Sequence, residues 1–200
     1  MSPTRIVRAL LAWLGLVLFA AWLPIAAVTW LPGWHAASCD WHARCDEYGR
    51  PAAMTRIAEL RAYMQHRGEL PVIAWTAKER AHLAEVRDLL GRYTVLALLG
   101  ALVFAHADAA TRARAARWAM LVAAAGVIVL PFFGSFWRDV FHPLLFDNLL
   151  WKNNAADTSF WIMPRIYFHY TTALVVGVAT LACALARAQA MRELVDSGRA

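Results

Sequence analysis

The stretch ALLAWLGLVLFAAWLPIAAVTWL, residues 9–31, is apolar almost from end to end and decides the kind of fold. At 1.5 Å of rise per residue, a helix of this length crosses the ~30 Å hydrocarbon core of a membrane. Arg5 and Arg8 precede it, as positive charges precede a signal peptide, but the apolar core of a signal peptide is usually only ~7–15 residues long. We therefore expect a retained membrane helix.

Further apolar blocks follow along the 200-residue chain. Hydrophobic residues make up 60% of the sequence and the mean hydropathy is +0.44, whereas soluble domains are usually about 45–50% apolar. The sequence therefore predicts an all-α, polytopic membrane protein with four transmembrane helices and a helical outer-face domain, forming a single membrane domain over residues 1–200. The predicted spans are about 9–31, 88–107, 118–136 and 167–186, and the predicted outward segments are 32–87 and 137–166.

Local signals predict helices in the first outward segment as well. Thr76-Ala77-Lys78-Glu79 fits a capping box, in which Thr76 caps a helix and Glu79 reaches back to it. A helix from Ala77 to Ala107 would be ~46 Å long, so part of it would project beyond the hydrocarbon. An amphipathic outer helix is predicted from the helical spacing of Met54, Ile57, Leu60 and Met64.

The distribution of charge predicts the orientation of the spans. The pieces expected in the cytoplasm carry eight arginines against three acidic residues, whereas residues 32–92 carry nine basic and eight acidic residues and residues 137–166 carry three of each. Cytoplasmic loops are enriched in Lys and Arg, so both termini are expected in the cytoplasm. The net charge of +6 therefore marks span ends rather than a nucleic-acid-binding surface.

His82 is the first candidate for chemistry. On a helix, Glu79 and Glu85 lie three residues to either side of it, within side-chain reach. A carboxylate beside an imidazole fixes its tautomer and raises its basicity, which suits a general base. The spacing alone also fits a solvated helix face of mixed charge.

His142 is the second candidate, in the apolar segment 141–151 that follows the third span. An ionisable group at the lipid boundary is costly, which makes it a functional candidate. A belt of interfacial aromatic and histidine residues is the alternative interpretation.

A third cluster comprises His35, Cys39, His42 and Cys45 in the first outward segment. A short disulfide loop, unpaired cysteines and a metal site with nitrogen and sulfur ligands are all compatible with this spacing. Cys183 lies within a span and is expected to pack there. The chain has no Gly-rich phosphate loop, which argues against nucleotide use.

Two motifs carry a family resemblance. One is Glu79-Arg80-Ala81-His82-Leu83-Ala84-Glu85-Val86, and the other is an ordered series of residues that begins at Phe141. On these residues the chain resembles the Lit family of lipoprotein intramolecular transacylases, over roughly residues 5–190. The second series consists of Phe141, His142, Phe146, Asn148, Trp151, Asp157, Pro164 and Phe168.

The resemblance implies a bacterial enzyme of the cytoplasmic (inner) membrane, with its active face outward, toward the periplasm. Such an enzyme moves an acyl chain from the diacylglyceryl group of a lipoprotein's N-terminal cysteine to the α-amino group of that cysteine. Its partners would be a diacylated lipoprotein or lipid substrate and membrane lipids, with no cofactor, metal, nucleotide or nucleic acid. The implied catalytic residues are His142, His82 and Glu79, and the implied substrate-binding residues are Asn148, Trp151, Phe141, Asp157 and Glu85.

The chain departs from the family pattern at three places. Glu85 stands where an aspartate is expected, Pro143 follows His142 directly, and the pair Cys39 and Cys45 is not a family feature. Two other functions remain open: a thiol–disulfide oxidoreductase that uses these two cysteines, and a non-enzymatic membrane assembly or binding protein.

Overall fold

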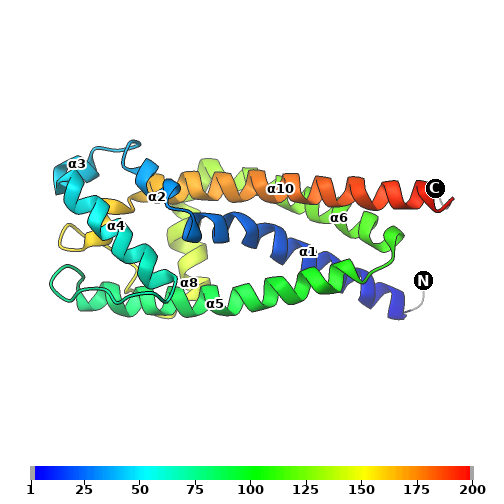
Figure 1. The fold of residues 1–200 in the computed structure, drawn as a ribbon, viewed down its shortest axis with the longest axis horizontal. Helices are drawn as coiled ribbons and strands as arrows, with labels where there is room; N and C mark the ends of the chain where they lie inside the picture. Colours follow the sequence, from blue (N-terminus) through cyan, green and yellow to red (C-terminus); the bar gives the residue numbers. More distant parts are fainter. Residues whose placement is uncertain (1–2, 199–200) are drawn as a thin grey trace. The chain divides into compact units, whose positions relative to one another are not determined.

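A computed structural model describes residues 3–198, and every regular element within that range is helical (Figure 1). The prediction of an all-α fold is therefore confirmed. In chain order the elements are α1 (Pro3–Trp30), α2 (Gly33–Ser38), α3 (Arg44–Tyr48), α4 (Arg50–Met64), α5 (Ala77–Ala105), α6 (Ala109–Ala125), the 3-10 helix η1 (Gly126–Phe132), α7 (Phe133–Ser135), the π-helix η2 (Phe136–Phe141), α8 (His142–Leu145), α9 (Thr158–Ile162) and α10 (Arg165–Asp196).

Four helical runs among the described residues are long and apolar enough to cross a membrane, which is the number predicted. Each begins before its predicted span, and the third and fourth also end after theirs, because helical structure continues past the apolar stretches into polar sequence. The second run begins at Ala77, as its capping box predicts. The runs are Thr4–Trp30, Ala77–Ala105, Ala109–Leu145 and Arg165–Asp196.

The third run changes its helical geometry along its length. After α6 it becomes a 3-10 helix that contains Pro131, and after α7 it becomes the π-helix η2. Proline cannot donate to the preceding turn and its ring crowds the carbonyl four residues earlier, so it disturbs an α-helix where it occurs. The π-helix ends at Phe141, immediately before His142.

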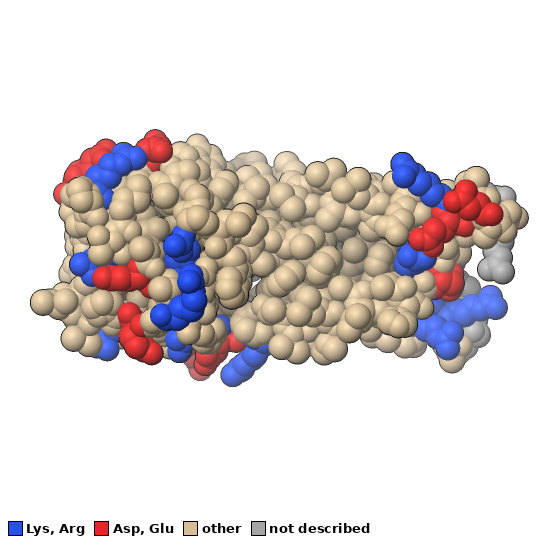
Figure 2. Space-filling model, viewed as in Figure 1, with Lys and Arg blue, Asp and Glu red and all other residues tan. Residues whose placement is uncertain are grey.

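One compact unit comprises Met1–Ile25, Leu90–Ile128 and Ala173–Ala200. A Cβ atom added to Gly100 of α5 would lie 2.7 Å from the Cα atom of Gly15 in α1, so these helices touch backbone to backbone. Membrane helices commonly use small residues for such approaches. Figure 2 shows charged side chains gathered where α10 ends. Arg112 of α6 pairs with Glu193 of α10. The buried core is Leu16, Ala20, Ala116, Ala119, Ala179 and Cys183.

The other unit comprises Ala26–Leu89 and Val129–Thr172 and has its own core. A helix is present at the predicted stretch, and α4 packs one side of it into that core, with Ile57 and Leu60 buried. The fully buried Trp75 donates its indole N–H to Glu59 at 3.0 Å. The core is formed by Cys39, Cys45, Ala53, Ile57, Leu60, Tyr63, Leu70, Trp75, Leu83 and Ile162.

Candidate active site

His82 and His142 lie together in the second unit, although they are far apart in the sequence. Their ring centroids are 6.2 Å apart and the ring planes are inclined by 36°. His82 lies in the second turn of α5, and His142 is the first residue of α8. His142 is buried and the His82 side chain is 12% exposed. Two imidazoles from separate segments therefore share one largely buried site.

The polar chain behind His82 runs through Glu85 to Asn148. The His82 Nδ1 atom lies 3.5 Å from Glu85 Oε2, a distance that is long for a hydrogen bond but within range of an ion pair once His82 is protonated. The Asn148 amide donates to Glu85 Oε1 at 2.8 Å. The carboxylate is thus held between an amide and an imidazole, which orients it toward His82.

His142 has a different environment, made of a backbone carbonyl and aromatic rings. Its Nδ1 atom lies 2.7 Å from the Trp137 carbonyl oxygen, so Nδ1 carries the proton and Nε2 keeps a lone pair when the ring is neutral. Trp151 stacks on the imidazole at 4.3 Å, Trp137 meets it edge-on at 4.6 Å, and Phe141 meets it edge-on at 5.5 Å. These rings exclude water from one side of the site.

The loop that follows α8 is fixed by Asn148 as well. The Asn148 side-chain oxygen accepts from the Leu150 N–H at 3.0 Å, and the Asn148 carbonyl accepts from the Trp151 indole at 3.0 Å. Asn148 therefore contacts both Glu85, through its side-chain amide, and the Trp151 indole, through its backbone carbonyl. Phe146, which precedes this loop, packs edge-on against His82 at 4.8 Å.

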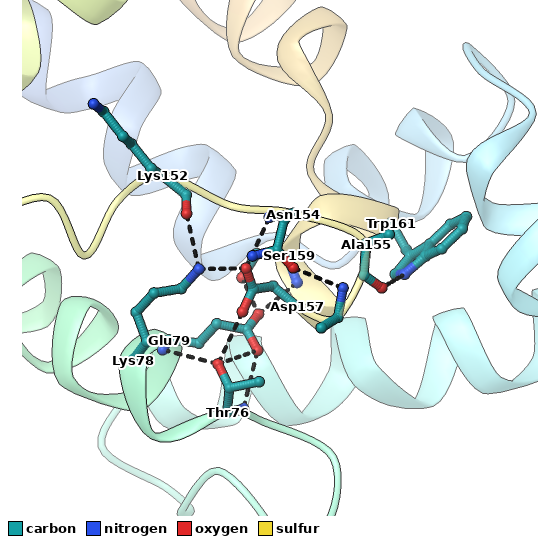
Figure 3. Close-up of polar contacts among 10 residues, drawn as sticks. Thr76, Lys78, Glu79, Lys152, Asn154, Ala155, Asp157, Ser159 and Trp161 are labelled. Carbon is teal, nitrogen blue, oxygen red and sulfur yellow. Dashed lines mark hydrogen bonds and ion pairs between the residues drawn. The ribbon is translucent and has the colours of Figure 1, made fainter.

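The position of α5 is set by a buried carboxylate, as Figure 3 shows. Glu79 accepts from the Thr76 N–H at 3.0 Å, and the Thr76 hydroxyl lies 3.2 Å from the Glu79 N–H, which confirms the capping box. The second carboxylate oxygen accepts from both the N–H and the hydroxyl of Ser159, each at 2.6 Å. Glu79 is 1% exposed, and it ties the start of α5 to α9.

Asp157 lies in the same group of contacts (Figure 3). It pairs with Lys78, accepts from the Asn154 N–H at 2.8 Å, and lies 3.0 Å from the Thr76 hydroxyl. Burial alone would raise the pKa of Asp157, but the hydrogen bonds from Lys78, Asn154 and Thr76 hold that pKa below its usual value.

Glu79 and Asp157 both make contacts that hold structural elements together, and their predicted roles stay predictions. We predicted Glu79 as a catalytic residue that could orient His82, and Asp157 as a substrate-binding residue. The hydrogen bonds of Glu79 join the start of α5 to α9, and the ion pair of Asp157 joins α5 to the segment just before α9. Of the two glutamates that flank His82, it is Glu85 that faces the imidazole.

The sequence analysis missed three residues of this region: Trp137, Lys78 and Ser159. Ser159 reaches Glu79 from 80 positions away, and Lys78 reaches Asp157 from 79 positions away. No local pattern reports such long-range pairs. Trp137 lies five residues before His142, but their contact depends on a π-turn, which has no side-chain pattern in the sequence.

The cysteines of the first outward segment form a disulfide, Cys39–Cys45, with a Cα–Cα distance of 5.4 Å. Within residues 3–198 no group of three or more His, Cys, Asp or Glu side chains is arranged to hold a metal ion. His35 belongs to another contact, since its Nε2 atom lies 2.8 Å from the Tyr167 hydroxyl. Burial lowers the pKa of His35 to about 4, so this imidazole is neutral at physiological pH.

Comparisons with known proteins bear on the family and on the fold. A family model described as "Lipoprotein intramolecular transacylase Lit" matches residues 6–168. A solved structure of the membrane-integral lipoprotein intramolecular transacylase Lit from Bacillus cereus is similar in fold, with a TM-score of 0.81, 14% identity and coverage of 98% of both chains. A mutant of that protein gives a TM-score of 0.78 at 15% identity, covering 98% of this chain and 94% of the other. A comparison with curated proteins gives no match.

The fold and the site define a multi-pass helical membrane protein with a buried histidine pair. Because the family model covers most of the sequence, the chain belongs to the Lit family of lipoprotein intramolecular transacylases, which are acyltransferases. The resemblance that the two motifs indicated is thereby confirmed.

Proposed function

We propose that the chain transfers an acyl chain within a diacylated lipoprotein, from the glycerol of its N-terminal cysteine to the α-amino group of that cysteine. The observation that supports this most directly is the convergence of His82 and His142, 6.2 Å apart. One bond forms, between the amine nitrogen and the acyl carbon, and one breaks, between that carbon and the glycerol oxygen. An ester becomes an amide, and one proton moves from nitrogen to oxygen.

His142 is the general base of this proposal. Its Nδ1–H is held by the Trp137 carbonyl, so its Nε2 atom can take the proton that the attacking amine must lose. An α-amino group has a reference pKa of about 7.7–8.0, so a substantial fraction is already neutral and needs only modest assistance.

His82 is the general acid that gives a proton to the departing glycerol oxygen. Its Nδ1 atom faces Glu85, which stabilises the protonated ring and leaves Nε2–H free to donate. Asn148 acts through Glu85 as a positioning residue. The proton taken by His142 can return to His82 through one bridging water, which resets the site.

The aromatic residues would hold the acyl chain beside the histidines. Trp151 and Phe141 line the His142 side of the site, and Leu144 and Leu149 nearby are 78% and 64% exposed. An apolar rim of this kind suits a lipid substrate, because the acyl chain can reach the reacting groups without crossing water.

We further propose that this site faces outward from the bacterial cytoplasmic membrane. The arginine-rich segment 107–117, most of which forms the start of α6, supports a cytoplasmic position for the end of α5 and the start of α6. The disulfide Cys39–Cys45 supports an oxidising compartment for the unit that carries the site. The test uses Ile73→Cys, at a position that is 93% exposed, and Ala110→Cys, at an exposed position in the first turn of α6. A membrane-impermeant maleimide applied to intact spheroplasts should label the first variant and not the second; the reverse pattern contradicts the orientation.

The reaction is tested with purified protein in lipid bicelles and a synthetic diacylated lipopeptide. Substrate and product have the same mass, so the assay follows loss of the free α-amine with an amine-reactive reagent and locates the acyl chain by fragmentation. Loss of a general base typically costs about 10²–10⁴-fold in rate, and we expect this for His142→Gln. His106→Gln is the matched control, because His106 is an exposed histidine of the other unit. An unchanged rate in His142→Gln would refute the proposal.

A further inference from the structure

The π-helix η2 ends at the proposed general base and holds it. Residues Phe136–Phe141 form this helix, and the His142 backbone N–H bonds to the Trp137 carbonyl five residues earlier. The same carbonyl lies 2.7 Å from Nδ1 of the His142 ring. The Trp137 carbonyl oxygen thus accepts from both the backbone N–H and the ring Nδ1–H of His142.

An ordinary α-helix would not make this arrangement. In an α-helix the His142 N–H would meet the Arg138 carbonyl, four residues earlier, and the Trp137 carbonyl would be taken by the N–H of Phe141. The additional residue in a π-turn shifts each partner by one position. It is this shift that turns the Trp137 carbonyl toward the imidazole.

Pro143 supplies a physical cause for the π-turn. It has no N–H to donate to the Asp139 carbonyl, and in an α-helix its ring would clash with that same oxygen. Widening the turn before it relieves the clash. Pro143 itself is exposed, whereas the histidine before it is buried, so its influence on the site passes through the backbone.

We propose that Pro143 is a positioning residue for the acyl transfer proposed above. By imposing the π-turn it keeps His142 as the Nδ1–H tautomer, with Nε2 unprotonated and available to the substrate amine. The stacked ring of Trp151 and the edge-on ring of Trp137 restrict the orientation of the imidazole, but only a hydrogen bond selects between its tautomers. This inference rests on the proposed role of His142, and it assigns a function to a residue that departs from the family motif.

The test is the Pro143→Ala variant, in which the tautomer is followed directly. The substituted alanine would regain a backbone N–H, the turn would close into an α-helix, and the Trp137 carbonyl would leave the ring. Nitrogen-15 NMR of histidine-labelled protein in lipid, with the His142 signals assigned by their loss in His142→Gln, should show the Nδ1–H tautomer in the parent protein and a mixture in Pro143→Ala. We expect kcat to fall about tenfold, the effect of losing one orienting hydrogen bond, while KM changes less than twofold.

Pro51→Ala is the matched control. Pro51 is an exposed proline in the first turn of α4, where the missing N–H has no helical partner in any case. Its replacement should leave both the tautomer and kcat unchanged. The proposal is overturned if the parent His142 is the Nε2–H tautomer, if Pro143→Ala keeps the parent tautomer, or if its kcat falls without any change in the His142 signals. The NMR comparison decides the effect of Pro143 even if the parent protein shows no transacylation, so failure of the proposed function is recognised separately.

Discussion

Replacing Glu79 with glutamine should release the segment around α9 from the start of α5. The carboxylate is 1% exposed, one oxygen accepts two hydrogen bonds from Ser159 at 2.6 Å, and the other accepts from the Thr76 N–H at 3.0 Å. A glutamine amide has only one acceptor oxygen, so its NH₂ group must face at least one buried donor.

The expected cost follows from those contacts. Hydrogen bonds to a charged group contribute about 1.5–3 kcal/mol each, and a buried donor left unpaired costs about 1–3 kcal/mol. Allowing for relaxation, we expect the opening of this region to become easier by about 3 kcal/mol, which is roughly a hundredfold in the opening equilibrium.

Hydrogen exchange with mass spectrometry measures this opening in peptides that span residues 155–162. Protection there should fall about a hundredfold in Glu79→Gln, while the transmembrane peptides keep theirs. Glu69→Gln is the control, since Glu69 is an exposed glutamate of the same unit. Protection that stays within threefold of the parent would refute the proposed role of Glu79 as a clamp, a buried carboxylate that joins the start of α5 to α9.

Three further outcomes follow from other contacts. The pKa of Asp157 is lowered in the folded protein, so its ionised form stabilises the folded state fully above the usual carboxyl pKa of about 3.9. That stabilisation is lost as the pH falls through the lower pKa of the folded state. The hydrogen-exchange protection of peptides around Asp157, corrected for intrinsic exchange, should therefore be constant from pH 7 to 5 and fall below about pH 4. Gly100→Ala should lower the thermal unfolding temperature in detergent, because the added Cβ would lie 2.7 Å from the facing glycine of α1 and overpacking costs about 1–3 kcal/mol. In denatured protein without reductant, a maleimide should label Cys183 alone, and after reduction it should label all 3 cysteines. The double variant Cys39→Ser/Cys45→Ser should lose about 2 kcal/mol of unfolding free energy, as expected for so short a closed loop.

Each of these outcomes has a control or a contradicting result. In Asp157→Asn the loss of protection at low pH should disappear, and its persistence would assign the effect to another group. Gly91→Ala adds a methyl where no atom outside the adjacent turns of its own helix lies within 4 Å, so equal destabilisation by this variant would rule out close packing as the cause. Labelling of three thiols without reductant would show that the disulfide is absent.

The sequence predicted the architecture well because the decisive signals are local. Apolar length determines the spans, and the capping box places the first residue of α5 at Ala77. It also selected both histidines: His82 because two glutamates flank it at helical spacing, and His142 because an ionisable side chain in an apolar segment is conspicuous. Their convergence required the motifs of the family, because no spacing within either segment reports the distance between them.

The partners of the histidines were harder to predict. Glu79 and Glu85 are equally spaced about His82, and spacing alone does not distinguish them. The difference lies in long-range contacts, because Ser159 donates a hydrogen bond to Glu79 whereas Asn148 donates one to Glu85. The role of Trp137 depends on a backbone carbonyl and on a π-turn, neither of which has a side-chain signature.

The two carboxylates of α5 that flank His82 have different contacts, which matters for any mutational study of this site. A carboxylate three residues before His82 sets the helix start, and one three residues after it faces the imidazole. Loss of either should reduce activity, so an activity assay alone would assign both to catalysis. Exchange at α9 separates them: it should rise in Glu79→Gln, whose carboxylate binds Ser159, and stay unchanged in Glu85→Gln, whose partners are His82 and Asn148. A rise in both variants would mean that the site and the clamp open as one unit, and the distinction between positioning and catalysis would then have to be drawn from kcat and KM.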